Sequence, residues 1–369
     1  MNSNNILQSP RMATALISVA VALIVLVALA TSTGASANGP GDKGKDKVVE
    51  RVVGADEHRK AKETPIDLIA KSSVPPVVED HGNGNGLDRK EGPDGPELSI
   101  YGVAPSSLAV SSTASFSTLA TTATTQNGPW TGSYSTNPNR QIGKLYFWTG
   151  SRWSHCTATA VNSENKSLIV TAGHCVYNPD PDNNGRVDGN GSWYTSVQFC
   201  PGYESGCKLG VWYARNLYTT NSWFYGSGTS KSYDWSDDLA VVLVSSNPTQ
   251  GRLVDAVGGH GITFNRPTAL MRHAFGYPIT DSRWPSYTYS GEDLIYCPGN
   301  DTSDGYGHLK LACTMTGGAS GGPWIIDPAS SWLGLVNSVN SHKAWGGSYM
   351  GGPYFGTAES DLFNYARTR

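Results

Sequence analysis

The sequence predicts an all-β fold, a sandwich or a barrel, for residues 129–369. Short apolar and β-branched runs alternate there with turns rich in Gly, Asn, Asp and Ser, as at 167–171, 239–244 and 332–336. No long segment with a 3.6-residue apolar period interrupts these runs until a short helix expected over 357–367. Strands that follow one another without crossover helices argue against a βαβ fold.

The first 37 residues resemble a signal peptide. Arg11 precedes an apolar run from Met12 to Ala30, and Ala35-Ser36-Ala37 supplies small residues for cleavage. The run is long enough that a retained membrane anchor is the alternative. Cleavage is favoured because no basic cluster follows the run, so we expect a secreted, extracellular protein that contacts a membrane only if this segment is kept.

Residues 38–128 differ in composition from the rest of the chain. Residues 38–103 are charged and broken by glycine-rich and proline-rich stretches, and 104–128 form a Ser/Thr/Ala-rich linker. Few apolar residues are available for burial in 38–103, so that stretch is expected to be disordered or only partly folded and the propeptide poorly ordered. The domains predicted are therefore a signal peptide (1–37), a prosegment with linker (38–128) and a β domain (129–369).

Charge and cysteine content limit the function classes. The formal net charge is −3, so no basic footprint suggests a nucleic-acid partner. The chain has six cysteines, an even number that suggests disulfides in an exported protein. Many pairings are possible, and pairing between neighbours is the one favoured: Cys156 with Cys175, Cys200 with Cys207, and Cys297 with Cys313. No Cys-x-x-Cys spacing points to zinc, and no cofactor is expected.

Local segments in the β domain carry residues suited to nucleophilic catalysis. His174 follows a predicted strand, Asp238 leads into another, and Ser320 lies in the glycine-rich loop 316–323. A serine hydroxyl needs an adjacent base, and histidine suits that role near neutral pH. A buried carboxylate orients the imidazole, and loop glycines let backbone N–H groups face an oxyanion. Gly318 and Ser320 are the expected donors.

The chain resembles the chymotrypsin-like serine peptidases. The order His, Asp, Ser is shared, with Thr-Ala-Gly-His-Cys at 171–175 and Gly-Ala-Ser-Gly-Gly-Pro at 318–323. Ala-Phe-Gly-Tyr-Pro at 274–278 is similar to the bacterial glutamyl-endopeptidase-like branch. The resemblance covers about residues 140–369. It implies two six-stranded antiparallel β-barrels with the active site between them, protein or peptide substrates, a Cys156–Cys175 disulfide, and Asp238 rather than Asp234 or Asp237 as the triad acid.

Departures from the family shape the expected maturation and specificity. Ala319 replaces the aspartate that binds the new N-terminus in digestive members, so a bacterial-type proenzyme with a removable propeptide is expected. A surface tether is the alternative role of 38–128. The pocket floor falls at Thr314, which does not suit Arg or Lys. An ungapped alignment puts Val336 where the related branch has a histidine, so a small or apolar pocket is expected instead of one for Glu.

Other readings of the sequence compete with a peptidase. A catalytically silent binding protein on the same fold is one alternative, and an esterase with the same triad is another, although the Ser, Asp, His order of α/β-hydrolases is absent. Asp180–Asp188 resembles part of a calcium loop, but Gly191 stands where the bidentate acid belongs, so a surface turn is favoured. The histidines other than His174 are expected to be surface or structural. No dimerisation signal was found, and a monomer is the default expectation.

Overall fold

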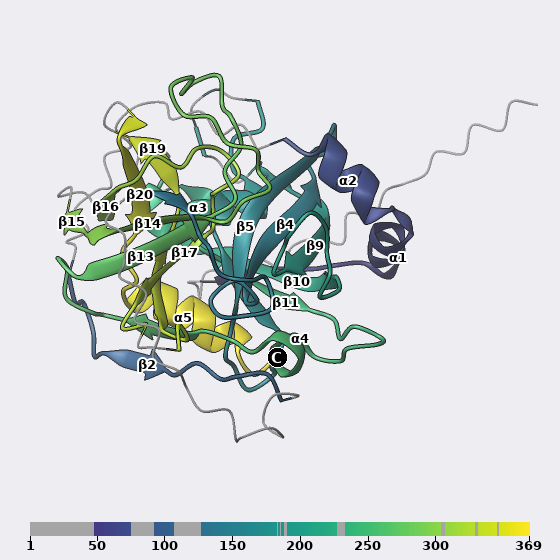
Figure 1. Ribbon diagram of the computed structural model, residues 1–369, viewed down its shortest axis with the longest axis horizontal. Coiled ribbons are helices and arrows are strands. Elements are labelled where there is room, and N and C mark those ends of the chain that lie inside the picture. Colours follow the sequence, from purple (N-terminus) through teal and green to yellow (C-terminus); the bar gives the residue numbers. More distant parts are fainter. Residues whose placement is uncertain are drawn as a thin grey trace, which may run out of the picture. The chain divides into compact units, whose positions relative to one another are not determined.

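The computed structural model describes residues 48–74, 92–106, 127–182, 184, 186–187, 190–226, 233–303, 307–328, 331–344 and 347–369. The expected signal peptide and most of the expected linker lie outside these residues. Within them no helix is long and apolar enough to cross a membrane. The predicted fold class is confirmed, because the described domain is mostly β with a short C-terminal helix (Figure 1).

Six strands close into the first barrel. They follow the order β10-β11-β6-β5-β4-β9, and a further pairing joins β9 to β10. Their side chains enclose a large apolar core that includes Trp212, Leu217 and Phe199. The strands are β4 (Ile142–Trp148), β5 (Trp153–Val161), β6 (Leu168–Thr171), β9 (Thr195–Pro201), β10 (Trp212–Thr220) and β11 (Ala240–Val244); β7 (Tyr177–Asn178) and β8 (Ser192–Trp193) form a small ribbon beside them.

The second half of the domain is built from two sheets. One has the order β2-β12-β18-β17-β13-β14-β3 and the other the order β15-β16-β20-β19. Its strands are β2 (Leu98–Ile100), β3 (Gly128–Pro129), β12 (Gly261–Phe264), β13 (Met271–Gly276), β14 (Ile295–Asn300), β15 (Thr302–Ser303), β16 (His308–Ala312), β17 (Pro323–Ile326), β18 (Leu335–Val339), β19 (His342–Ala344) and β20 (Tyr349–Pro353).

The helices are short, as the strand-rich sequence predicted. They are α3 (Asn221–Tyr225), α4 (Leu253–Val257) and α5 (Thr357–Ala366), with single turns η2 (Gly173–Cys175) and η3 (Trp235–Asp237). The C-terminal helix α5 confirms the expectation for 357–367. The Glu359 carboxylate accepts from the Gly356 N–H (2.8 Å) at its start, and Leu362 and Phe363 are buried against the core.

The prosegment is more ordered than its composition suggested. It forms β1 (Val48–Val52), α1 (Ala55–Glu63), α2 (Ile66–Ser72) and β2 (Leu98–Ile100), so 48–74 and 92–106 are ordered within a segment predicted to be disordered or only partly folded. The reason is that these residues pack against the domain, not against one another. β1 pairs with β10 of the first barrel, and β2 pairs with β12 of the second half.

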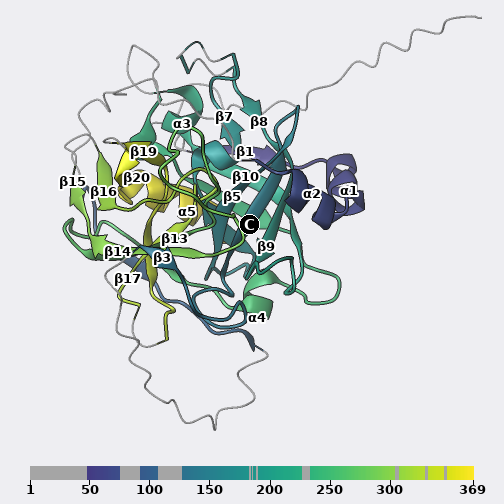
Figure 2. The same ribbon diagram turned by 45° about the horizontal axis from the view of Figure 1, so that its top comes forward.

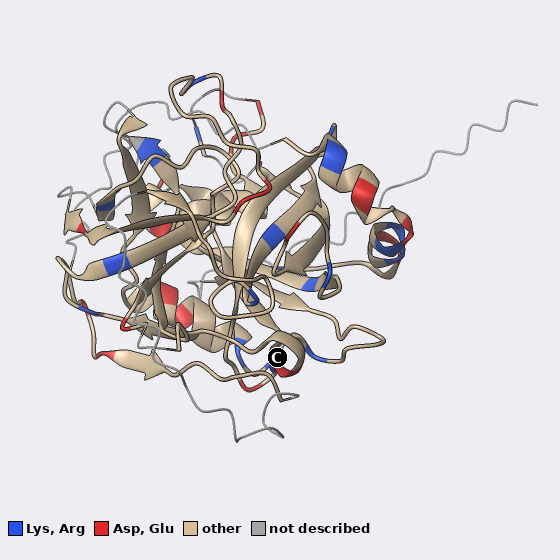
Figure 3. Ribbon diagram, in the orientation of Figure 1, with Lys and Arg blue, Asp and Glu red and all other residues tan. Residues whose placement is uncertain are grey.

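Charged residues are concentrated away from the barrel strands. Figure 3 shows Lys, Arg, Asp and Glu on α1 and α2, while most strand ribbons carry few of them. Figures 1 and 2 place these two helices on the outer side of the first barrel, beside β9. The prosegment therefore covers the barrel with a polar outer surface.

Candidate active site

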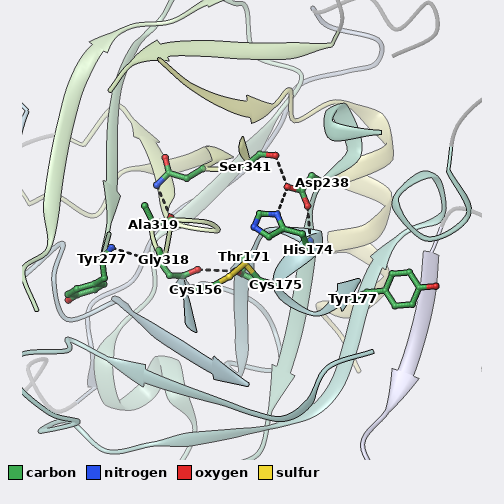
Figure 4. Close-up of a disulfide and its surroundings, with 12 residues drawn as sticks. Cys156, Thr171, His174, Cys175, Tyr177, Asp238, Tyr277, Gly318, Ala319 and Ser341 are labelled. Carbon is green, nitrogen blue, oxygen red and sulfur yellow. Dashed lines mark hydrogen bonds and ion pairs between the residues drawn. A yellow bond between two sulfur atoms is a disulfide. The ribbon is translucent and has the colours of Figure 1, made fainter. Parts of the chain in front are cut away.

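His174 lies on η2, directly after the buried strand β6. Its backbone N–H donates to Asp238 Oδ1 (2.8 Å), and its Nδ1 lies 2.8 Å from Asp238 Oδ2 (Figure 4). An ionised carboxylate only accepts hydrogen bonds, so Nδ1 carries the proton and Nε2 has the free lone pair. Gly173 permits this approach, because a Cβ there would lie 3.0 Å from Asp238 Oδ1 and 2.8 Å from the Trp223 ring. The imidazole is held in the tautomer that a general base requires.

Asp238 is completely buried between η3 and β11. Burial acts to raise the pKa of its carboxyl group. The charge and hydrogen bonds of His174, together with the Ser341 hydroxyl, outweigh burial and hold that pKa below its ordinary value. The neighbouring Asp234 instead accepts a hydrogen bond from Ser236. Of the acids in this segment, Asp238 is the one that the structure brings to His174.

Ser341 is a site residue that the sequence analysis missed. Its hydroxyl donates to Asp238 Oδ2 at 2.6 Å, so the carboxylate has a third hydrogen bond from the second half of the domain. Ser341 immediately precedes β19 and follows β18 after a single residue, Asn340. The ungapped alignment used Val336 as the reference on this strand, which placed the site-facing residues too early in the chain.

Ser320 lies in the glycine-rich loop before β17 and is partly exposed. Its carbonyl accepts from the N–H of Thr157 in β5 (2.7 Å), and the Gly321 N–H donates to the Asn340 carbonyl (2.7 Å). A Cβ at Gly321 would lie 2.8 Å from the backbone nitrogen of Ala172, two residues before His174. The loop is thus packed against the segment that carries His174. Among the described residues, no hydrogen bond joins the Ser320 hydroxyl to the His174 ring.

Gly318 directs the peptide groups of the same loop. Its carbonyl accepts from the Thr157 hydroxyl (2.9 Å), and its φ of +91° is in the region that favours glycine. A Cβ at this position would lie 2.7 Å from both His155 Nε2 and the Tyr277 carbonyl. Within the described part of the chain, the N–H groups of Gly318 and Ser320 donate to no protein group. Both are available to a ligand oxygen.

Asn340 ties the loop to its supporting strands, and sequence reasoning missed it as well. Its side-chain amide donates to the carbonyls of Ala319 (3.0 Å) and Phe275 (2.8 Å), and its Oδ1 accepts from the Trp324 indole (2.7 Å). Each bond is buried, so it has little competition from water. A buried, fully bonded amide of this kind holds the loop conformation.

The predicted disulfide pairing is confirmed for all cysteines. Bonds join Cys156 to Cys175, Cys200 to Cys207, and Cys297 to Cys313, and no cysteine is free. The first bond links Cys175, which follows His174, to Cys156, which precedes Thr157. Thr157 in turn bonds the Ser320 loop. It lies within ligand distance of the His174 ring, but oxidised cysteines are not metal ligands. The cluster therefore offers no set of thiolate ligands for a metal.

Comparison with solved structures decides the family. The protease Anisep from Arthrobacter nicotinovorans is 31% identical, with a TM-score of 0.52 over 66% of this chain and 100% of its own. A thermostable serine protease, AL20, from an extremophilic microorganism is also 31% identical, with a TM-score of 0.51 over 62% of this chain and 98% of its own. The chain belongs to the chymotrypsin-like serine peptidases.

The wider comparisons agree with this family at the level of fold. A Glu endopeptidase structure aligns at a TM-score of 0.50 over 67% of this peptidase and 99% of its own chain, with 19% identity, which supports the shared fold. No protein-family model matches the peptidase, and no curated protein does. The active-site elements must therefore be judged from the geometry of this chain.

The remaining sequence candidates are the resembled calcium loop and the other histidines. In the resembled calcium loop, Asp180 Oδ1 accepts from the Asn184 backbone N–H (3.0 Å) and Asp182 from the Asn184 side chain (2.8 Å), as in a self-bonded turn. Asp188 lies outside the described residues. His260 is buried, and burial lowers its pKa to about 3, so it is a neutral core residue.

Proposed function

We propose that this peptidase is a serine endopeptidase that cleaves peptide bonds through an acyl-enzyme on Ser320. His174 Nε2 removes the hydroxyl proton as Ser320 Oγ attacks the substrate carbonyl carbon, and then passes that proton to the leaving amine. Water hydrolyses the acyl-enzyme by the same route in reverse. Asp238 keeps Nδ1 protonated and stabilises the imidazolium that forms. The N–H groups of Gly318 and Ser320 bind the oxyanion.

The observation that carries this proposal is that the buried Asp238 carboxylate accepts hydrogen bonds from both the backbone N–H and the ring Nδ1 of His174. A desolvated carboxylate is unfavourable unless its oxygens are bonded, and here both are, with His174 as the main partner. A structural role alone does not require an imidazole with a free Nε2 beside a loop with two unbonded N–H groups. The catalytic roles explain all of these features together.

A fluorophosphonate probe on the processed protein tests the triad. We expect labelling that maps to Ser320 in the wild type and is absent from Ser320→Ala. The His174→Ala variant should fold and label at least about 1,000-fold more slowly, because the base is lost. Processed, folded wild type that does not label would instead favour a catalytically silent binding protein.

We also propose that the chain is secreted as a proenzyme whose prosegment restrains the site. The prosegment is anchored on the first barrel by Glu57, which accepts from the Ser196 N–H of β9 (3.0 Å). Arg51, also in the prosegment, pairs with the same Glu57 carboxylate (2.5 Å). After α2, Val74 accepts from the His155 N–H and donates to the Trp153 carbonyl, both at 3.2 Å. A second backbone is thus added to the edge of β5.

That edge leads directly to the proposed nucleophile. The Ser73 hydroxyl lies 3.1 Å from Nδ1 of His155, whose Nε2 faces the position of Gly318. Two residues later, Thr157 holds the carbonyls of both Gly318 and Ser320. A substrate backbone that approached this edge would have to displace Val74. This is the support for inhibition by the prosegment.

Labelling rates with and without the prosegment test this idea. The intact chain should label slowly, and the rate should rise when the prosegment is removed and the N-terminus falls between about residues 105 and 135. Val74→Pro removes the N–H that bonds Trp153 and should speed labelling of the intact chain. Leu68→Ala, an exposed α2 position, is the matched control and should leave the rate unchanged. Equal labelling of intact and processed protein would favour a tether.

A further inference from the structure

Lys144 is a buried lysine that the proposed mechanism does not use. It lies on β4, and its side chain is only 3% exposed. Its Nζ lies 3.5 Å from a carboxylate oxygen of Glu292, in the loop between β13 and β14, and 3.9 Å from the centre of the Tyr203 ring. A buried ammonium group is unfavourable unless it is paired, so Lys144 and Glu292 are held together across the two halves of the domain.

The strand face that carries Lys144 also supports the Ser320 loop. Lys144 is paired with Thr157 across β4 and β5, and directly opposite residues of an antiparallel pair share a face. The Thr157 hydroxyl donates to the Gly318 carbonyl (2.9 Å) and accepts from the Tyr277 N–H (2.9 Å). Lys144 therefore lies beside the residue to which Gly318 is bonded.

Tyr277 connects the ion pair of Lys144 and Glu292 to the loop. Its hydroxyl donates to the Tyr203 carbonyl (3.0 Å), and the Tyr203 hydroxyl lies 3.0 Å from both carboxylate oxygens of Glu292. The Tyr277 carbonyl lies 2.7 Å from the position that a Cβ of Gly318 would take (Figure 4). A shift of Glu292 would thus reach Gly318 through two hydrogen-bonded tyrosines.

The glycine-rich loop has no charged residue of its own. Residues 316–323 read Thr-Gly-Gly-Ala-Ser-Gly-Gly-Pro, and Ala319 stands where digestive members of the family carry the aspartate that binds a new N-terminus. Glycine is conformationally permissive, so a loop of this composition depends on its surroundings for one fixed conformation. A charge pair on neighbouring elements can supply that support.

We propose that Lys144 and Glu292 are positioning residues for the oxyanion site. Their ion pair fixes Tyr203 and, through it, Tyr277. The Gly318 N–H is thereby kept directed at the oxyanion. The inference rests on the proposed peptidase function. Neither charged residue touches the substrate in this role, so the loss of either should slow the chemical step more than it weakens substrate binding.

The charge of Lys144 makes this support sensitive to alkaline pH. Burial lowers the pKa of its ammonium group to about 8. Burial also keeps the other aromatic groups of the cluster neutral near this pH, because it raises the pKa of each tyrosine hydroxyl and lowers that of the histidine: Tyr146, Tyr203, Tyr277 and His155. The carboxylates near these groups are Glu292, Glu204, which pairs with Lys208 (2.5 Å), and Asp67 of the prosegment. The ion pair therefore loses its positive charge as the pH rises through about 8.

Kinetics of the processed enzyme on an uncharged peptide test the proposal. In Lys144→Met, kcat should fall by about 10-fold, less than the roughly 100- to 1,000-fold for outright loss of an oxyanion donor, while KM changes little. Lys144→Arg keeps the charge and should restore part of kcat. Glu292→Gln should lower kcat by a similar factor, and the double variant should be no slower than Lys144→Met, because both residues act through one pair. Lys208→Met removes an exposed lysine–glutamate pair and, as the matched control, should keep the wild-type kcat.

The outcomes separate this proposal from the peptidase function itself. Wild type that labels at Ser320 with a fluorophosphonate, together with an unchanged kcat in Lys144→Met, would refute the positioning role and leave the triad intact. A lower Tm without a lower kcat would refute it as well, because the pair would then act on stability alone. Folded wild type that does not label would refute the peptidase function instead. If Lys144→Met does not fold, Glu292→Gln gives the same test, since Glu292 is 47% exposed.

The pH dependence of kcat/KM gives a second readout of the same charge. The wild-type value on an uncharged peptide should fall as the pH rises through about 8, because Lys144 of the free enzyme loses its proton there. In Lys144→Met the value should be low and constant between about pH 7 and 10. In Lys144→Arg it should show no fall near pH 8, because arginine keeps its proton. A constant wild-type value, or a fall near pH 8 that persists in Lys144→Arg, would overturn the proposal.

Discussion

Replacing Gly321 with alanine tests whether close packing of the Ser320 loop against the first barrel positions the proposed nucleophile. A Cβ at this position would lie 2.0 Å from the Thr171 hydroxyl, 2.4 Å from the Thr157 carbonyl and 2.8 Å from the Ala172 nitrogen. Two of these atoms belong to backbone, so they cannot rotate away. The φ of +78° adds the strain of a left-handed alanine.

The expected effect follows from these distances. A left-handed alanine costs about 1–2 kcal/mol in stability. Relieving the contact with the Thr157 carbonyl requires the loop to move by about 1 Å, and a misplacement of that size lowers catalytic rates by about 100-fold. Gly321→Ala should therefore lose stability and also label with a fluorophosphonate about 100-fold more slowly than the wild type.

Gly251→Ala is the matched control. Gly251 has the same φ of +78°, but no atom lies within 4 Å of the position of its Cβ. It should lose stability from backbone strain alone and label at the wild-type rate. Tm and labelling rate are measured for both variants at a temperature where each is folded. If Gly321→Ala labels as fast as Gly251→Ala, the loop is not held by this packing, and the reasoning is wrong.

Other predictions test the supports of the site. Removing the Cys156–Cys175 bond, whose sequence separation is 19, should lower stability by about 3 kcal/mol on the chain-entropy model, measured by denaturant unfolding of the double alanine variant. Ser341→Ala should lower kcat by about 10-fold and raise the pKa of Asp238, since one donor to its carboxylate is lost, whereas Ser341→Thr should keep much of the activity. Because the folded-state pKa of Asp238 is lowered, its stabilising contribution is present above its unfolded pKa and is lost as the pH falls through the folded value. The Tm difference between wild type and Asp238→Asn should therefore shrink in strongly acidic solution, and a constant difference would contradict the sign of the shift.

The parts of the molecule that the sequence predicted are those with a local pattern. The strands around His174 and Asp238 were predicted because each is a short, continuous apolar run next to a polar residue. The pairing of Cys156 with Cys175 was predicted because the two are neighbours among the cysteines and because the family resemblance implies this bond. Such features depend on few residues and little on the rest of the fold.

The order within the prosegment could not be predicted from its composition, because that order depends on a distant surface. Val48 and Val49 do not form a core of their own, and composition alone indicated disorder. They become ordered by pairing with Thr220 and Thr219 of β10, more than 160 residues along the chain. A sequence window cannot register this pairing, because the gain in free energy comes from the partner strand.

Ser341 was missed because its position depends on the length of a turn. Positions after Ser320 were counted without gaps, which made Val336 the reference residue. The turn between β17 and β18 includes residues with positive φ, Asp327 and Trp332, and its length determines which residues of the next strand reach the site. The hydrogen bond from Ser341 to Asp238 identifies which residue of this segment reaches the site. A site residue on a strand that follows such a turn has to be located through its hydrogen bond to a proposed catalytic group, since counting from Ser320 carries every insertion in the turn into the assignment.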